Sequence, residues 1–225
     1  MSVASIDNII INNNLLSSID LQDLLSHTKN IQLANELLPN GEGCDYYNDG
    51  SPVKVKARTL NIFNGDASNV LGKLVDAINP IVEFKYGQRL VCDQWVSARM
   101  WSKDDYQSPH SDSEFNNSEL CLDIDDSNPN WNLNIPRFLA DYSSLVYLNE
   151  DYEGGELVFP EYGLEIKPKA GDVITFPTNA MYLHAVNKII SGTRYNVVLK
   201  WFRKTTLISN TMPKNTAVKN LLETL

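Results

Sequence analysis

The chain has 225 residues, of which 43% are hydrophobic, so it is long enough to bury a sizeable core within one domain. Its formal charge of −9 disfavours a general attraction to nucleic acid or to anionic lipid surfaces. The sequence shows neither a basic leader followed by an apolar core nor a window approaching the ~20 apolar residues of a membrane span. We therefore expect no nucleic-acid partner and no membrane partner.

The cysteines point to a reducing compartment. The chain has three of them, Cys44, Cys92 and Cys121, which are far apart and form no CxxC pair. This number and spacing favour neither a disulfide scaffold nor a zinc–thiolate site. We expect a cytoplasmic location.

Residues 1–85 are predicted to form a helical front together with the first strands. Apolar residues at helical spacing predict a helix over 20–38, capped by its first residue, and a second helix over 68–78, which Pro80 would end. Between them, the alternation of residues 53–63 predicts a strand. Both helices are expected to cover a sheet.

The chain from residue 89 to residue 203 has a dense strand signal. A strand is predicted within 89–101, and six short apolar runs follow between Gly, Pro, Asn and Asp residues: 143–149, 155–160, 163–168, 172–177, 181–186 and 194–202. Short strands at such regular spacing are typical of a β-sandwich or barrel. The connection 111–136 is irregular, and the tail 204–225 is predicted to be peripheral.

Two of the three histidines suggest a metal site. His27 falls on the first predicted helix, where an ordinary surface position explains it. His110 and Asp112 are two residues apart, so on an extended segment they share a face and can reach one ion, although such a triplet also occurs by chance. His184, on a late predicted strand, completes a set of two imidazoles and one carboxylate. This facial triad suits non-haem Fe(II) and leaves coordination positions open for substrates.

An arginine follows the last of these ligands at a suggestive distance. Arg194 comes ten residues after His184, across the turn signal at 191–193, so a hairpin would bring its guanidinium beside the metal strand. A planar and permanently charged group in that place would pair with a carboxylate. Taken alone, Arg194 also fits a surface ion pair on a strand.

Residues 89–203 carry four blocks in a characteristic order. They are HSD (110–112), LVYLNEDYEGGELVFP (145–160), IKPKAGDVITFP (166–177) and LHAVNKIISGTRYNVVLKWF (183–202). In this order the blocks resemble those of the Fe(II)/2-oxoglutarate-dependent dioxygenases, specifically the prolyl 4-hydroxylase-like branch. The resemblance implies a mainly β fold with flanking helices. Its core, over 89–203, would be a double-stranded β-helix (jelly-roll, cupin-like) within a single domain 1–225.

The resemblance also implies roles for individual residues. His110, Asp112 and His184 would bind iron, and Arg194 would pair with the distal carboxylate of 2-oxoglutarate. Tyr147 would offer its hydroxyl to the same carboxylate, and Leu157 would line the cosubstrate pocket. From the residues alone, Tyr147 and Leu157 fit an ordinary core equally well.

The activity that the resemblance implies is hydroxylation of an unactivated C–H bond, prolyl 4-hydroxylase-like on a peptide or protein, with release of succinate and CO2. It requires Fe(II), 2-oxoglutarate and O2, with ascorbate as a further candidate cofactor. Two alternatives stay open. One is an oxygenase of a free amino acid, another small molecule or a nucleobase, and the other is a catalytically inert β-helix binding module.

Two charged features have both an ordinary and a functional interpretation. Lys200 follows Arg194 by six residues, where many members of the family have tryptophan, and it loosely resembles the second arginine of the alkylation-repair demethylases. We favour a solvated strand residue instead. The acidic residues clustered over 104–126 form either a solvated loop or a mobile lid that prefers a neutral or cationic peptide or free amino acid.

Overall fold

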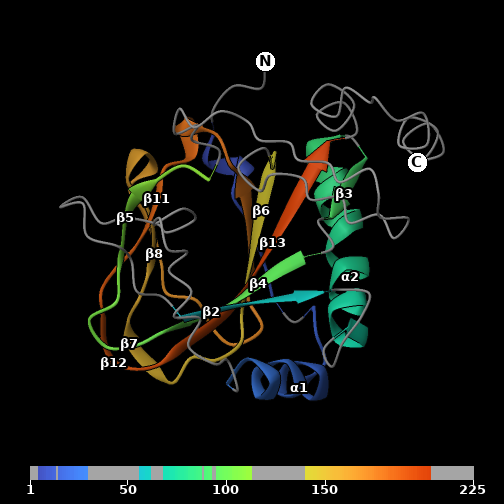
Figure 1. The fold of residues 1–225 in the computed structure, drawn as a ribbon. Helices are drawn as coiled ribbons and strands as arrows, with labels where there is room; N and C mark the ends of the chain where they lie inside the picture. Colours follow the sequence, from blue (N-terminus) through green and yellow to red (C-terminus); the bar gives the residue numbers. More distant parts are fainter. Residues whose placement is uncertain are drawn as a thin grey trace, which may run out of the picture.

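The computed structural model describes residues 5–13, 15–29, 56–61, 68–87, 89–92, 95–112 and 140–203 (Figure 1). Of these, residues 56–61, 68 and 95 are described by their backbone alone. The predictions for residues 30–38, for 113–136 of the irregular connection and for the tail 204–225 lie outside the described residues.

The larger of two facing sheets has seven strands within the described residues, all paired antiparallel. Its order is β1 (Ile10–Asn12), β10 (Val173–Pro177), β6 (Tyr142–Tyr147), β13 (Arg194–Arg203), β4 (Trp95–Trp101) and β2 (Lys56–Asn61), with β3 (Leu90–Cys92) also paired to β13. Strand β13 is therefore central. Eight of its ten residues are buried, because helices cover one of its faces and the smaller sheet covers the other.

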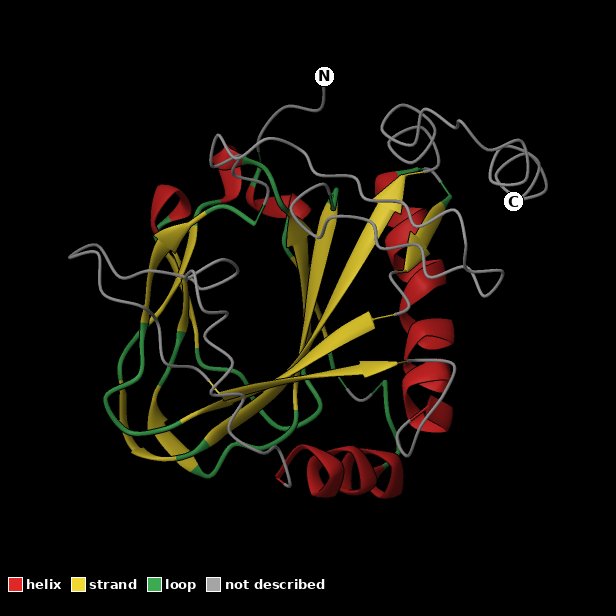
Figure 2. Ribbon diagram, viewed as in Figure 1, coloured by secondary structure: helices red, strands yellow, loops and turns green. Residues whose placement is uncertain are grey.

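The smaller sheet faces this one across the core (Figure 2). Its order is β5 (Gln107–His110), β11 (His184–Val186), β8 (Leu157–Phe159) and β9 (Leu164–Ile166), again antiparallel. A two-stranded pair, β7 (Tyr152–Gly154) with β12 (Ile189–Gly192), adjoins the two sheets at one end of the fold (Figure 1). Two antiparallel sheets of short strands confirm the predicted mainly β fold, a double-stranded β-helix. Short 3-10 turns at Ile6–Asn8, Pro160–Tyr162 and Ala180–Tyr182 complete the described elements.

Two helices lie on the side of the larger sheet that faces away from the smaller one (Figure 2). They are α1 (Ser18–Lys29) and α2 (Ser68–Tyr86), and Leu24, Leu71 and Leu74 on their inner faces are fully buried. These leucines share one hydrophobic cluster with residues of β4, β6 and β13, so the helices cover the sheet as predicted. No helix among the described residues is long and apolar enough to cross a bilayer.

Both helices differ from their predictions at the ends. In α1 the cap is Ser17 and not Asp20, because the Ser17 hydroxyl oxygen accepts a hydrogen bond from the Asp20 backbone N–H at 3.1 Å. In α2 the prediction that Pro80 ends the helix is wrong, since the helix continues to Tyr86. An interior proline costs about 3 kcal/mol. Burial of Val82 and stacking of Tyr86 on Tyr142, at 3.9 Å between ring centroids, offset that cost.

The alternation along β13 decides which of its residues face the interior between the sheets. Val197, Leu199 and Trp201 belong to the cluster on the helix side, whereas Val198 belongs to the cluster between the two sheets. Successive side chains of a strand point to opposite faces. Even-numbered residues of β13, including Arg194 and Lys200, therefore face the space between the sheets.

Candidate active site

The two predicted histidine ligands are cross-strand neighbours on the smaller sheet. Strands β5 and β11 pair so that His184 lies directly opposite His110, with ring centroids 4.3 Å apart. The two residues are 74 positions apart in the chain, and the antiparallel register alone brings them together. His184 also packs against Phe159 and Phe176 of the cluster between the sheets, so its ring faces the interior.

Asp112 completes the cluster two residues after His110. One Asp112 carboxylate oxygen, Oδ1, is 3.8 Å from Nε2 of His110, and the other, Oδ2, is 3.9 Å from Nε2 of His184. One ligand atom from each of the three residues lies within 4.8 Å of the others. The structure therefore brings together the three residues predicted to bind iron.

The second nitrogen of each ring fixes which nitrogen faces the cluster. Nδ1 of His110 lies 2.9 Å from the Ser108 carbonyl oxygen, and Nδ1 of His184 lies 3.2 Å from the Tyr182 carbonyl oxygen. In each pair the Nδ1–H donates to the carbonyl, which leaves the Nε2 lone pair for an ion. Metal-bound histidines are oriented in the same way.

The protonation states of the cluster suit a cation. Burial lowers the pKa of His184 to about 3, and the neighbouring His110 adds to this lowering, so the ring is neutral. Burial alone would raise the pKa of Asp112, but the neighbouring Lys200 ammonium holds it well below its usual range. A carboxylate with two imidazoles is the donor set of a facial Fe(II) site. The residues present therefore fit the ion that the family implies.

Lys200 also belongs to this cluster, so the favoured interpretation as a solvated strand residue is wrong. It is only 5% exposed, and its Nζ lies 2.5 Å from Oδ2 of Asp112. The correction has a simple cause, since β13 is covered on both faces and has no solvated side. Ser143, opposite Lys200 in the register, donates to the same Oδ2 at 2.5 Å and accepts from Nζ at 2.8 Å. Asp112, Ser143 and Lys200 form a closed triangle, which we call the aspartate lock.

Arg194 is buried at the other end of the same face of β13. Its side chain is 1% exposed, and its guanidinium carbon lies 4.5 Å from the centroid of the Trp101 ring and 5.5 Å from that of Tyr147. Nη1 donates to the carbonyl of Gly155 at 2.8 Å. Gly155 has φ +69°, and a Cβ there would collide with Ile189, so only glycine lets the backbone approach in this way. The alternative of a surface ion pair is wrong, because the side chain is inside the protein.

The Arg194 site has three buried polar groups without a partner among the described residues. They are Nε of Arg194 and the hydroxyls of Tyr147 and Tyr152. Burial raises the pKa of both tyrosines, for Tyr152 to about 12, so both hydroxyls remain donors near neutral pH. Unpaired buried donors are rare and costly. Two such hydroxyls beside a guanidinium that itself has an unpaired N–H indicate a place for an anion.

Leu157 and Tyr152 lie beside this site. Leu157 is fully buried in the cluster between the sheets that also holds Tyr147, which is compatible both with core packing and with a pocket wall. Tyr152 packs with Trp101 and lies next to Arg194 across Gly155. The sequence interpretation did not single out Tyr152. The signal that could have found it is its position in the same block, five residues after Tyr147.

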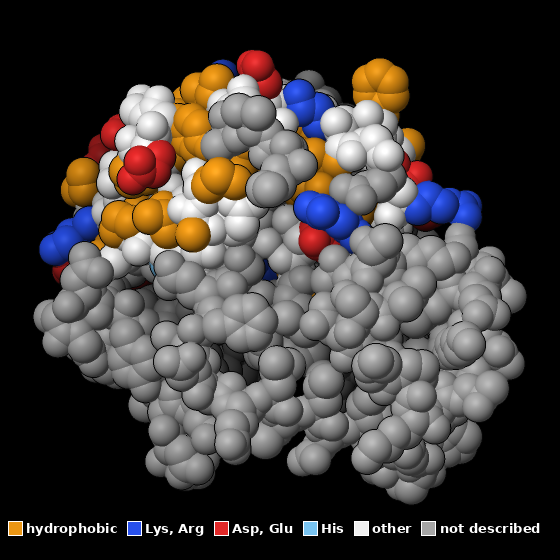
Figure 3. All heavy atoms as spheres, turned by 90° about the horizontal axis from the view of Figure 1, so that it is seen from above, with side chains coloured by type: hydrophobic (Ala, Val, Ile, Leu, Met, Phe, Trp, Pro, Cys, Tyr) orange, Lys and Arg blue, Asp and Glu red, His pale blue; other side chains and the backbone are white. Residues whose placement is uncertain are grey.

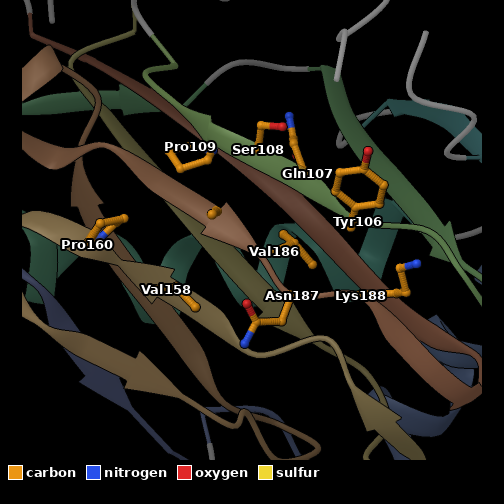
Figure 4. A pocket seen from close by; sticks show the side chains of 10 residues that line it. Tyr106, Gln107, Ser108, Pro109, Val158, Pro160, Val186, Asn187 and Lys188 are labelled. Carbon is orange, nitrogen blue, oxygen red and sulfur yellow. The ribbon is translucent and has the colours of Figure 1, made fainter. Parts of the chain in front are cut away.

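A separate groove of about 510 Å³ lies on the outer side of the smaller sheet (Figure 4). Its lining includes Val158 and Ala185, which alternate with the inward-facing Leu157 and His184. Neither His110, Asp112 nor His184 is among the residues that line this groove. Viewed from above, the described part of the surface carries Lys and Arg side chains interspersed with hydrophobic and acidic ones (Figure 3).

Comparison with known proteins agrees with the site. Residues 98–203, which carry the cluster and Arg194, match the family model of the 2OG-Fe(II) oxygenase superfamily. Prolyl 3-hydroxylase 2 of Rattus norvegicus is 32% identical over 162 residues, covering 68% of this chain and 22% of that protein. The human protein of the same name is 30% identical over the same shares. The chain thus spans less than a quarter of the length of these relatives.

Solved structures share the fold. A viral collagen prolyl hydroxylase from Paramecium Bursaria Chlorella virus-1 superimposes with a TM-score of 0.60 at 19% identity, over 89% of this chain and 98% of that one. A prolyl hydroxylase from Trichoplax adhaerens, solved with a hypoxia inducible factor peptide fragment, gives 0.61 at 16% identity, over 89% and 86%. Residues 98–203 therefore resemble the 2OG-Fe(II) oxygenase superfamily, and the chain resembles prolyl hydroxylases in sequence and shares their fold.

Proposed function

We propose that the protein is an Fe(II)- and 2-oxoglutarate-dependent dioxygenase that hydroxylates a proline in a peptide or protein and releases succinate and CO2. The observation that carries the proposal is the buried Arg194, whose charge has no carboxylate partner among the described residues. An unpaired buried cation is costly unless an anion comes to it. The distal carboxylate of 2-oxoglutarate is that anion, and the histidine–aspartate cluster would hold iron on the same inner surface.

The chain's own residues would bind and orient the reactants. His110, Asp112 and His184 would hold Fe(II), which supplies the activation of O2 when it is bound. Arg194 would pair with the distal carboxylate, Tyr147 would donate its hydroxyl to it, and Leu157 would wall the pocket. Arg194 and Tyr147 are almost fully buried, so little water would reach the carboxylate there, which would strengthen these polar contacts.

The names of the relatives support a proline as the substrate. Prolyl 3-hydroxylase 2 and the Trichoplax adhaerens prolyl hydroxylase carry this activity in their names, and the latter was solved with a peptide. The proposal follows the sequence in favouring position 4 of proline, whereas the matched rat and human relatives are named for position 3. Analysis of the hydroxyproline isomer in the product would separate the two positions.

The proposal also includes a single domain over residues 1–225, a cytoplasmic location and the use of ascorbate as a reductant. Ascorbate has the simplest test, because turnover with and without it can be compared in the same assay. A sustained rate with ascorbate and a declining rate without it would support its role.

The alternative functions differ in the substrate that is oxygenated. Succinate release can be screened against proline-rich peptides, free amino acids and methylated oligonucleotides, with product mass checked for one added oxygen atom. The proposal expects succinate and oxygenated product with a peptide. Oxygenation of a free amino acid or an oligonucleotide would reassign the substrate, and a protein that binds neither Fe(II) nor 2-oxoglutarate would be an inert binding module.

The Tyr152 hydroxyl is expected to act as an additional donor to the distal carboxylate. Tyr152→Phe should weaken the binding of 2-oxoglutarate about tenfold, since a hydrogen bond to a charged group contributes about 1.5–3 kcal/mol. Because this hydroxyl has no described partner, its loss should leave the melting temperature of the free protein unchanged or higher. Calorimetric titration without O2 and thermal unfolding measure the two effects.

A 2-oxo acid that lacks the distal carboxylate, such as 2-oxopentanoate, provides the matched control. Wild-type protein and Tyr152→Phe should bind it equally, and Tyr147→Phe should follow the same pattern. A Tyr152→Phe protein that loses stability but binds 2-oxoglutarate like wild type would assign the hydroxyl to the core instead.

A further inference from the structure

Lys200 lies against a proposed metal ligand, where its charge opposes a metal ion. Its Nζ is 2.5 Å from Oδ2 of Asp112, and its side chain is 6% exposed. A second cation at that carboxylate reduces the attraction that Asp112 can offer to Fe(II). Burial of a lysine also costs desolvation energy. A lysine at this position therefore cannot be explained by tighter binding of the metal.

In the aspartate lock the two carboxylate oxygens of Asp112 have different partners. Oδ2 receives both the Lys200 ammonium and the Ser143 hydroxyl, each at 2.5 Å. Oδ1 is bonded to neither of them and lies 3.8 Å from Nε2 of His110. With Oδ2 engaged, Asp112 can offer a metal ion one oxygen and not two.

The number of Asp112 oxygens that bind the metal matters, because the metal must also bind a 2-oxo acid and O2. A facial triad leaves coordination positions for substrates only if its carboxylate takes a single position. A carboxylate that bound through both oxygens would occupy a position needed for a chelating 2-oxo acid or for O2. The lysine also adds one positive charge beside the metal, which favours an anionic chelator over water.

We propose that Lys200 is a positioning residue that keeps Asp112 bound through Oδ1 alone and so favours 2-oxoglutarate at the metal. The inference rests on the proposed function and deepens it. It predicts opposite changes in two affinities when the lysine charge is removed. Metal should bind more tightly, because a repelling charge is lost and Oδ2 becomes free, whereas 2-oxoglutarate should bind more weakly.

The test uses Lys200→Met, which keeps an unbranched side chain without the charge. Dissociation constants for Co(II) are measured first, and then those for 2-oxoglutarate on the Co(II)-loaded protein, so that no turnover is needed. We expect the Co(II) constant to fall severalfold and the 2-oxoglutarate constant to rise about tenfold. Parallel weakening of both ligands, or no change in either, would overturn the proposal.

Three controls make the result specific. Lys200→Arg keeps the charge and should retain 2-oxoglutarate affinity within about threefold, and Ser143→Ala should shift both affinities in the Lys200→Met direction by less. Lys188→Met removes a lysine whose side chain is 58% exposed and should change neither affinity. If Lys200→Met does not fold, an Arg variant that loses 2-oxoglutarate binding or a Ser143→Ala variant unchanged in both affinities overturns the proposal. Wild-type protein that binds metal but no 2-oxoglutarate would instead refute the proposed function.

Discussion

Replacing Arg194 by methionine is expected to weaken 2-oxoglutarate binding by about a hundredfold or more, because a buried charge pair contributes about 2–5 kcal/mol to such a complex. The same change should not lower the stability of the free protein. Arg194 is 1% exposed, and its Nε has no described partner, so methionine removes an uncompensated charge and keeps much of the volume. Calorimetric titration with 2-oxoglutarate and urea unfolding of the free protein give the two quantities.

The proposed metal site provides the control for the Arg194 variant. Co(II) affinity should match that of wild type, since Arg194 makes its recorded contacts with Trp101, Tyr147 and Gly155 and with none of the three proposed ligands. A variant that binds 2-oxoglutarate normally would contradict the assignment of this residue. A variant that loses stability by several kcal/mol would show instead that the guanidinium is a structural group.

Replacing Asp112 by alanine is expected to abolish metal binding and to destabilise the protein by about 3–5 kcal/mol. The loss of stability arises because Lys200 would remain buried with its carboxylate partner removed. Replacing His110 by alanine should also abolish metal binding but leave the aspartate lock intact. Its effect on stability should therefore be smaller, which separates the two roles of Asp112.

A double variant tests this explanation of the Asp112 effect. Asp112→Ala combined with Lys200→Met removes both charges, so most of the lost stability should return while metal binding stays absent. Chemical unfolding of the four proteins gives the coupling energy between the two residues. Additive losses of stability in the double variant would contradict a direct charge pair.

The sequence predicted that His110, Asp112 and His184 come together, because the chemistry of such a site depends on few residues. An HxD triplet and one later histidine on a strand are enough to define a facial triad, and the antiparallel register then places His184 opposite His110. Arg194 was predictable for a similar reason, since its distance from His184 fits one hairpin. These residues were identified because their types are rare in the chain or fixed in spacing.

Other features depend on tertiary contacts that no local pattern encodes. The sequence favours a solvated Lys200, because nothing near it in sequence reveals that helices cover one face of β13 and the smaller sheet faces the other. Helix α2 continues through Pro80, because packing of Val82 and Tyr86 outweighs the intrinsic cost of an interior proline. The position of Tyr152 beside Arg194 depends on the close approach of both side chains to Gly155, which the sequence does not show.

The most direct test of the central claim is a stoichiometric oxidation. The protein is loaded without O2 with Fe(II) and 2-oxoglutarate, a proline-rich peptide is added, and the sample is then exposed to air. The account predicts succinate in an amount equal to peptide carrying one added oxygen atom, with neither product from His184→Ala. Equal succinate from wild type and His184→Ala, or none from wild-type protein shown to bind both ligands, would contradict it.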